Sequence, residues 1–542
     1  MREIWPVLMA LAWLPAHAGS AAPELILVDG RIFTADAAHP YVQALAIGAG
    51  RILAAGNTAD IEALADGHTR RLDLKGRVVI PGLNDAHYHL NVDPPDATEV
   101  QVKGMDPGWA EVREALGAKA ASTPRGTLLE LRIGARIFND TTVNRDSLDE
   151  LSADHPVILD TYTGHAEILN SAALERAGIH EDIRDPVDGR YERDAGGRLT
   201  GVAREYASMQ VDRNLADATS DADAVREVRT TLSRAARWGI TSLQDMSNEL
   251  DPARAVRLLK SVPTPIRVRV MRMPMTTPAG RDLHEGRGLP RRPAPLITVS
   301  GTKWLLDGVP LEFTLDARGS HGDWGTGNFD TLVRELPPAF PQGQMRAMLE
   351  ESLREHDPLL LHVSGYPAAK AMLEAMEASG GPGVWADKRV RFEHGDGLLP
   401  DLIPRVRALG IVVVQNPTHF AVLGDDVLKM AQPVRTLIEA GIPVAFGSDG
   451  PLNPYLNIML AVLHPHTHSE GITREQAVIA YTRTSAYAEF QENDKGTLTP
   501  GKLADLAVLS QDIFSVPLPQ LPNTTALLTL VGGRVVYDAK AL

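Results

Sequence analysis

Two histidines separated by one residue are the first candidates for chemistry in this sequence. His87 and His89 follow an apolar run, residues 78–80, which stops at Pro81-Gly82. In a strand, residues i and i+2 point to the same side, so both imidazoles would aim at one spot just beyond a buried strand. Neutral imidazole is a good ligand for zinc, manganese, nickel or iron. The pair suggests the start of a metal site, although two solvated or hydrogen-bonded histidines give the same pattern.

Three later residues could complete such a site. His362 and His394 stand at or near the ends of apolar segments, and Asp449 follows another. Several neutral histidines and one carboxylate suit zinc, iron, manganese or nickel, and do not suit calcium or magnesium. A divalent metal lowers the pKa of a bound water and polarises a carbonyl oxygen. Asp449 could ligate the metal, accept the proton of that water and pass it to a leaving nitrogen, and His394, if it is not a ligand, could hold the carbonyl oxygen.

The elements that must position these residues alternate between apolar strands and helical stretches, which is typical of a parallel α/β fold. If residues 91–230 are an insertion, eight strands remain, and eight such strands predict a (β/α)8 TIM-like barrel with its chemistry at the carboxyl ends of the strands. The eight expected strands carry, in order, His87 and His89, Asp245, Val268, Lys303, His362, His394, Gln415 and Asp449.

Both ends of the chain read as β structure. Asp29-Gly30 predicts a hairpin between residues 25–28 and 31–33, and Gly532-Gly533 predicts another near the C-terminus. We therefore expect a small composite β-sandwich domain from residues 19–80 plus 496–542. The barrel would occupy residues 81–495, with 91–230 as an inserted capping region.

Composition limits the partners. The 542 residues are 44% hydrophobic and carry a formal net charge of −15 without a long basic run, so neither nucleic acid nor an anionic membrane is an expected partner. We expect a small-molecule substrate, and the sequence leaves a homo-oligomer open.

The first 18 residues read as an export signal. Arg2 precedes a short apolar stretch, residues 4–14, and Ala16-His17-Ala18 resembles a cleavage site. The chain has no cysteine, which rules out thiolate ligands and suits an oxidising compartment. We expect a signal peptide over residues 1–18 and a periplasmic or secreted mature protein.

Three segments resemble the amidohydrolase superfamily of metal-dependent hydrolases. Residues 81–89, Pro-Gly-Leu-Asn-Asp-Ala-His-Tyr-His, resemble its first-strand motif, Gly447-Ser448-Asp449 resembles its last-strand aspartate motif, and residues 495–506 resemble the return to the small sheet domain. Within the insert, Gly164-His165, residues 170–174 and residues 201–205 resemble the YtcJ-like branch, which includes N-substituted formamide deformylases.

The resemblance implies further roles. A strand-four lysine, here Lys303, would be carboxylated and bridge two metals, whereas a lysine paired with Asp307 or another nearby acid would leave one metal. Zinc is the first choice of ion. His165 and Glu205 of the insert would contact substrate. His419, which follows the seventh strand, is a third substrate-contact candidate.

Two weaker candidates complete the set. Asp245 at the end of the second strand could support a ligand from behind. His464, His466 and His468 could form a second metal patch, although a solvated loop is the simpler explanation and the one that we expect.

The sequence therefore predicts a hydrolase that uses metal-activated water to cleave a C–N bond of amide type. Lactonase, esterase or phosphotriesterase activity on the same site is an alternative, and so is a non-catalytic periplasmic metal- or solute-binding protein. Asp449 distinguishes the last alternative, because a binding protein needs no base beside its metal.

Overall fold

The computed structural model describes residues 22–542 except 105, 309–333, 335, 422–431 and 466. The expected signal peptide, residues 1–18, lies outside the described residues, and so does His466. Within the described ranges, no helix has both the length and the apolar character needed to cross a membrane.

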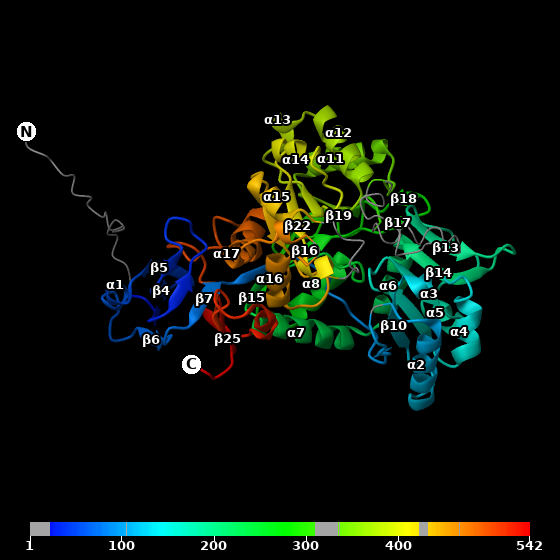
Figure 1. Cartoon of the computed structure of the whole chain (residues 1–542), viewed down its shortest axis with the longest axis horizontal. Coiled ribbons are helices and arrows are strands. Elements are labelled where there is room, and N and C mark those ends of the chain that lie inside the picture. The colour runs from blue at the N-terminus through cyan, green and yellow to red at the C-terminus, as the bar shows by residue number, and fades with distance from the viewer. Residues whose placement is uncertain (1–21, 105, 309–333, 335, 422–431, 466) are drawn as a thin grey trace, which may run out of the picture.

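A parallel sheet of eight strands forms the centre of the molecule (Figure 1). Its strands are ordered as in the sequence, and the last approaches the first where the Asp449 backbone N–H donates to the His87 carbonyl oxygen at 3.0 Å. Most strand residues are buried, as expected for a sheet covered by helices. The expected (β/α)8 barrel is confirmed. Its strands are β8 (Leu83–Tyr88), β15 (Ile240–Asp245), β16 (Arg267–Arg272), β19 (Ile297–Leu305), β20 (Leu359–Val363), β21 (Arg391–His394), β22 (Val412–Gln415) and β23 (Val444–Phe446).

Helices follow most of these strands along the chain, and the buried residues of all but the last helix share one large apolar cluster with the strands. They are α7 (Asp221–Arg237), α8 (Pro252–Ser261), α11 (Gln342–Glu355), α12 (Tyr366–Ala378), α13 (Pro382–Trp385), α14 (Ile403–Ala408), α15 (Val434–Glu439), α16 (Pro454–Leu463), α17 (Arg474–Ile479) and α18 (Ser485–Ala488). A short hairpin, β17 (Thr276–Thr277) and β18 (Gly280–Arg281), follows β16.

Both termini build two sheets that share a core, as expected for a composite sandwich. One sheet has the order β5-β4-β1-β6 and the other β26-β25-β24-β7-β2-β3. The elements are β1 (Leu25–Val28), β2 (Arg31–Phe33), β3 (Tyr41–Val42), β4 (Ala44–Gly48), β5 (Arg51–Gly56), α1 (Thr58–Glu62), β6 (Arg70–Asp73), β7 (Val78–Pro81), β24 (Leu506–Leu509), β25 (Ala526–Val531) and β26 (Arg534–Asp538).

The hairpin predicted at Asp29-Gly30 is wrong. β1 pairs with β4 and β6 in one sheet, whereas β2 pairs with β3 and β7 in the other. The turn signal is real, since Asp29 has a φ of 55°, but the chain uses it to pass between sheets. The hairpin around Gly532-Gly533 is confirmed, because β25 and β26 pair antiparallel.

The apolar run and the His-x-His also belong to different sheets. β7 ends at Pro81 in the terminal sandwich, and β8 begins at Leu83 in the barrel. Gly82 lies between them, where a Cβ atom would overlap the side chain of Thr241. His87 therefore lies on a barrel strand of its own, and the expectation that residues 78–80 form the strand that presents it is wrong.

The insert after β8 forms its own sheet, with the order β13-β14-β12-β11-β10-β9. It lies at the opposite end of the molecule from the terminal sandwich (Figure 1). The expected C-terminal boundary of the insert, residue 230, falls inside helix α7, which covers the barrel. The last helix of the insert, α6, ends at residue 218. The elements are β9 (Thr98–Glu99), α2 (Trp109–Ser122), β10 (Leu129–Ile133), α3 (Ala135–Phe138), α4 (Arg145–Ser152), β11 (Val157–Thr161), β12 (Ala166–Leu169), α5 (Ser171–Arg176), β13 (Gly189–Arg193), β14 (Leu199–Glu205) and α6 (Tyr206–Ala218).

Candidate metal centre

His87 and His89 present their Nε2 atoms to the same point. His87 Nδ1 lies 2.7 Å from Glu393 Oε2, and His89 Nδ1 lies 3.2 Å from Asn248 Oδ1. Because each Nδ1 faces an acceptor oxygen, each carries its proton there and leaves an Nε2 lone pair. Burial lowers the pKa of His87 well below its usual value and that of His89 to about 4, so both rings stay neutral. The two Nε2 atoms are 3.3 Å apart.

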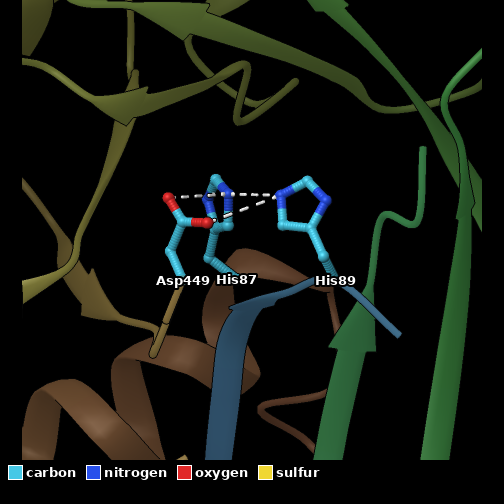
Figure 2. A group of neighbouring side chains, drawn as sticks. All are labelled: His87, His89 and Asp449. Carbon is cyan, nitrogen blue, oxygen red and sulfur yellow. Dashed lines mark hydrogen bonds and ion pairs between the residues drawn. The ribbon is translucent and has the colours of Figure 1, made fainter. Parts of the chain in front are cut away.

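The Asp449 carboxylate faces both imidazoles (Figure 2). Its Oδ2 lies 3.5 Å from His87 Nε2, and its Oδ1 lies 3.6 Å from His89 Nε2. Burial raises the pKa of Asp449, but the surrounding side chains, which include the Lys303 ammonium, outweigh burial and hold the pKa well below its usual range. The residue is therefore a carboxylate, and three acceptor atoms converge, with Lys303 Nζ 3.4 Å from one of them, His87 Nε2.

The backbone at Asp449 is held in an unusual conformation. Its φ is 38°, a left-handed value that non-glycine residues seldom adopt. Its N–H donates to the His87 carbonyl, and its own carbonyl accepts from His419 Nε2 at 2.9 Å. The preceding Ser448 donates its backbone N–H to Asp85 at 2.9 Å. Such strain persists only where the surroundings enforce it, and it gathers at functional sites.

The spacing of the three acceptors fits a metal ion. Ligand atoms about 2.0–2.1 Å from a tetrahedral zinc ion lie roughly 3.3–3.4 Å from one another. The observed separations among His87 Nε2, His89 Nε2 and Asp449 are 3.3, 3.5 and 3.6 Å. Lone pairs at this spacing repel unless a cation lies among them, so the donor set suits a divalent ion.

A second group shares Asp449. His394, His419 and Asp449 each offer a ligand atom within 4.8 Å of the others. His394 Nε2 lies 3.7 Å from Asp449 Oδ2, and His394 also has a left-handed φ, 66°. His362 adjoins this group, since its ring centroid is 4.5 Å from that of His394. Burial lowers the pKa of both His362 and His394 well below the usual value, so their rings are also neutral and can offer a lone pair to a metal.

Lys303 extends from β19 towards His87 and is 1% exposed. Its Nζ lies 3.4 Å from His87 Nε2 and 3.1 Å from Met246 Sδ. The alternative pairing with Asp307 does not occur, because that carboxylate accepts backbone N–H groups of residues 364–365. Among the described residues, no carboxylate lies within ion-pair distance of Lys303. Burial lowers the pKa of its ammonium to about 8.

The insert reaches this site through two residues. His165 Nδ1 pairs with Glu205 Oε2 at 2.8 Å, and the His165 ring lies 5.1 Å from the His362 ring. Glu205 has a φ of 48° at the start of α6. His419 lies on the other side, with its ring stacked on His394 at 5.7 Å. The structure thus brings all nine candidate residues into one contiguous group.

The weaker candidates lie elsewhere. Asp245 accepts the Leu90 backbone N–H at 2.9 Å, which holds the chain just after His89. His464 is buried and lies 3.1 Å from the Gln432 carbonyl, so a solvated loop is wrong for this residue. In the described part of the chain, neither His464 nor His468 belongs to a metal-compatible group.

Sequence reasoning missed the residues behind the ligands. Glu393 is completely buried, accepts from Arg391 at 2.8 and 3.0 Å, and orients His87. Arg391 also donates to Gln244 at 2.6 Å. The available signal was Arg-x-Glu on a buried strand, since charged residues two apart share one face. Asn248 carried no comparable signal.

Comparison with known proteins agrees with this geometry. The model of the amidohydrolase family matches residues 70–537. The chain is 27% identical to Protein LONG AFTER FAR-RED 3 of Arabidopsis thaliana, over 98% of this chain and 95% of that protein. It is 24% identical to the N-substituted formamide deformylase of Arthrobacter pascens, over 95% and 98% respectively.

The fold is shared with a solved structure. An uncharacterised metal-dependent hydrolase from Pyrococcus horikoshii superposes with a TM-score of 0.66 at 19% identity, covering 91% of this chain and 99% of that one. The family and branch expected from the motifs are confirmed by the family match and the deformylase relative. The chain belongs to the amidohydrolase family and is a hydrolase of that family.

Proposed function

We propose that this protein is a divalent-metal-dependent hydrolase that cleaves an amide-type C–N bond of a small molecule. The observation that carries the proposal is the convergence of two neutral imidazoles and one carboxylate at tetrahedral spacing. His87, His89 and Asp449 would hold one ion, with zinc as the first choice. His362 and His394 lie beside these three residues and would help to hold a second ion.

A metal ion at this site supplies Lewis acidity, which lowers the pKa of an attacking water and polarises a carbonyl. Asp449 accepts the proton that the water loses and returns it to the leaving nitrogen, which makes the amine a neutral leaving group. His165, oriented by Glu205, faces the same space from the insert and positions the substrate there.

The chemical form of Lys303 would determine whether the site holds one metal ion or two. A buried amine without a carboxylate partner is free to react with carbon dioxide, and the N–C bond so formed gives a carbamate and releases one proton. That carbamate would supply the anionic bridge between two ions, whereas a bare amine leaves a single ion. Intact mass measured in bicarbonate distinguishes the two forms.

An amide-type substrate is favoured by the relative that spans nearly the same length, an N-substituted formamide deformylase. The test is a screen of metal-loaded protein against N-formyl amines, N-acyl amines, lactones, carboxylic esters and phosphotriesters. We expect release of amine from an N-formyl or N-acyl compound. Turnover confined to lactones, esters or phosphotriesters would contradict the C–N assignment, and no turnover with any class would favour a binding protein.

The matched control is the double variant His87→Ala/His89→Ala. Elemental analysis should show lower bound metal in this variant, and turnover of any substrate found in the screen should fall with it. Full metal occupancy in the variant would mean that the ligand set is misassigned.

A further inference from the structure

A polar cavity lies at the opposite end of the barrel from the candidate metal centre. Its volume is about 610 Å³, within the range of small-molecule sites. Its walls include Ser242, Arg267, Arg269 and Ser300, which stand in the first halves of their strands. The metal centre is built at the strands' carboxyl ends, so the cavity opens at the amino-terminal face.

The described lining of this cavity is rich in cations. Seven arginine and lysine side chains and four carboxylates line it, in a chain whose formal net charge is −15. Three of the cations are already neutralised, since Arg51 pairs with Asp494 at 2.9 Å, Lys495 with Glu489 at 2.7 Å, and Arg267 with Asp505 behind the wall at 2.7 Å. The remaining charge is not balanced by the lining.

Arg269 is the deepest of these cations and is 3% exposed. Its Nε donates to Ser300 Oγ at 2.9 Å and its Nη1 to Gln244 Oε1 at 3.1 Å. Its Nη2 is buried without a hydrogen-bond partner, and no carboxylate in the described chain lies within ion-pair distance of it. A buried guanidinium with a spare donor and no counter-ion is costly unless an anion completes it.

Arg269 is also fixed in place. Gln244 Oε1, which accepts from it, accepts from Arg391 at 2.6 Å as well, and Arg391 is bound to Glu393. This chain of hydrogen bonds runs through the barrel interior to His87. Because its contacts hold the guanidinium in one orientation, little side-chain entropy is lost when a ligand binds.

Three more cations stand at the exposed rim. Arg291 donates to the uncharged His356 carbonyl at 3.0 Å, and Arg292 and Lys388 are exposed. Within the described ranges, none of these three cations has a carboxylate within ion-pair distance. Charges spread from the rim to Arg269 match a ligand with several anionic groups better than a single small ion.

We propose that this cavity is a binding site for a small polyanion that carries two or three carboxylate or phosphoryl groups. Arg269 would contact one anionic group at the base, and the rim cations would contact another. Arginine binds carboxylate and phosphate oxygens through paired N–H donors, which suits both chemistries.

The test is calorimetric titration of the full-length, metal-loaded protein with tricarballylate and, separately, with inorganic pyrophosphate at matched ionic strength. We expect saturable binding, near one site per chain, for at least one probe. Binding of tricarballylate alone would assign carboxylate chemistry, and binding of pyrophosphate alone would assign phosphoryl chemistry. Absence of saturable binding with both probes overturns the proposal.

Variants locate the site. Arg269→Gln should weaken binding about tenfold, the usual effect of losing hydrogen bonds from a charged group. Should that buried change impair folding, the exposed double variant Arg292→Ala/Lys388→Ala should still weaken binding about two- to tenfold. The matched control is Arg125→Ala, an arginine of the insert whose side chain is 82% exposed, and it should bind as the parent does.

The metal centre must be excluded as the place where the probes bind. His87→Ala/His89→Ala should bind the better probe with unchanged affinity, because those residues lie at the other end of the barrel. Loss of binding in this variant, together with unchanged binding in Arg292→Ala/Lys388→Ala, would overturn the proposal.

Discussion

The two ends of the barrel are polar in opposite senses. At the carboxyl ends of the strands, His87, His89 and Asp449 turn acceptors towards one point. At the amino-terminal ends, Arg269 retains a spare donor in a wall rich in cations. A cluster of acceptors stabilises a cation, and a cluster of donors stabilises an anion. We therefore expect the carboxyl ends of the strands to bind a cation and the amino-terminal ends to bind an anion.

A buried hydrogen-bond network joins the two ends. It runs from His87 through Glu393, Arg391 and Gln244 to Arg269. Its three middle members, Glu393, Arg391 and Gln244, hold His87 and Arg269 in place without belonging to either ligand set. We therefore ask whether a substitution at one end alters ligand binding at that end alone or at both ends.

The largest expected effect is at Asp449. Asp449→Asn keeps the size of the side chain but removes its negative charge and its ability to accept a proton. We expect it to retain much of the bound metal by elemental analysis and to lower kcat about 100- to 10,000-fold, the usual contribution of a general acid–base group. Anion binding at the far end should not change. Unchanged turnover would rule out the proposed proton transfer.

A smaller effect is expected at Glu393, which orients His87. Glu393→Gln should lower metal affinity about 10- to 100-fold, as for other carboxylates behind a metal-binding histidine. Competition with a chromogenic chelator measures this affinity. The matched control is Glu377→Gln, because Glu377 also pairs with an arginine, Arg405, but is 42% exposed. Equal metal affinity in both variants would show that Glu393 does not position His87.

A third test concerns packing beside His87. A Cβ atom at Gly447 would overlap the Cβ and backbone nitrogen of His87. Gly447→Ala should therefore lower the free energy of unfolding by about 1–3 kcal/mol, as overpacking does. Gly343→Ala, in α11, brings the new Cβ within 4 Å of no atom of the described residues, and should instead stabilise by roughly 0.5–1 kcal/mol. Denaturant unfolding compares the two, and equal stabilities would contradict the close approach.

The barrel and its candidate ligands could be predicted from the sequence because their signals are local. His-x-His, a histidine at a strand end and an aspartate after the last strand can each be read within a few residues. Strand order then brings them together, since the carboxyl ends of parallel strands meet at one face.

The rest depends on contacts between distant residues. Glu393 meets His87 across 306 positions of the chain, and no periodicity encodes that pairing. The turn at Asp29-Gly30 looks the same whether its strands pair with each other or enter two sheets. The cationic cavity is assembled from strand starts and loops, and the placement of loop side chains is set by tertiary packing.

The most direct test of the central claim is anomalous diffraction from crystals of the metal-loaded protein, measured at the absorption edge of the bound metal. We expect a peak about 2.0–2.2 Å from His87 Nε2, His89 Nε2 and an Asp449 carboxylate oxygen. An anomalous peak at another place in the protein would contradict the assignment. So would the absence of a peak at this point in crystals of protein that contains stoichiometric metal.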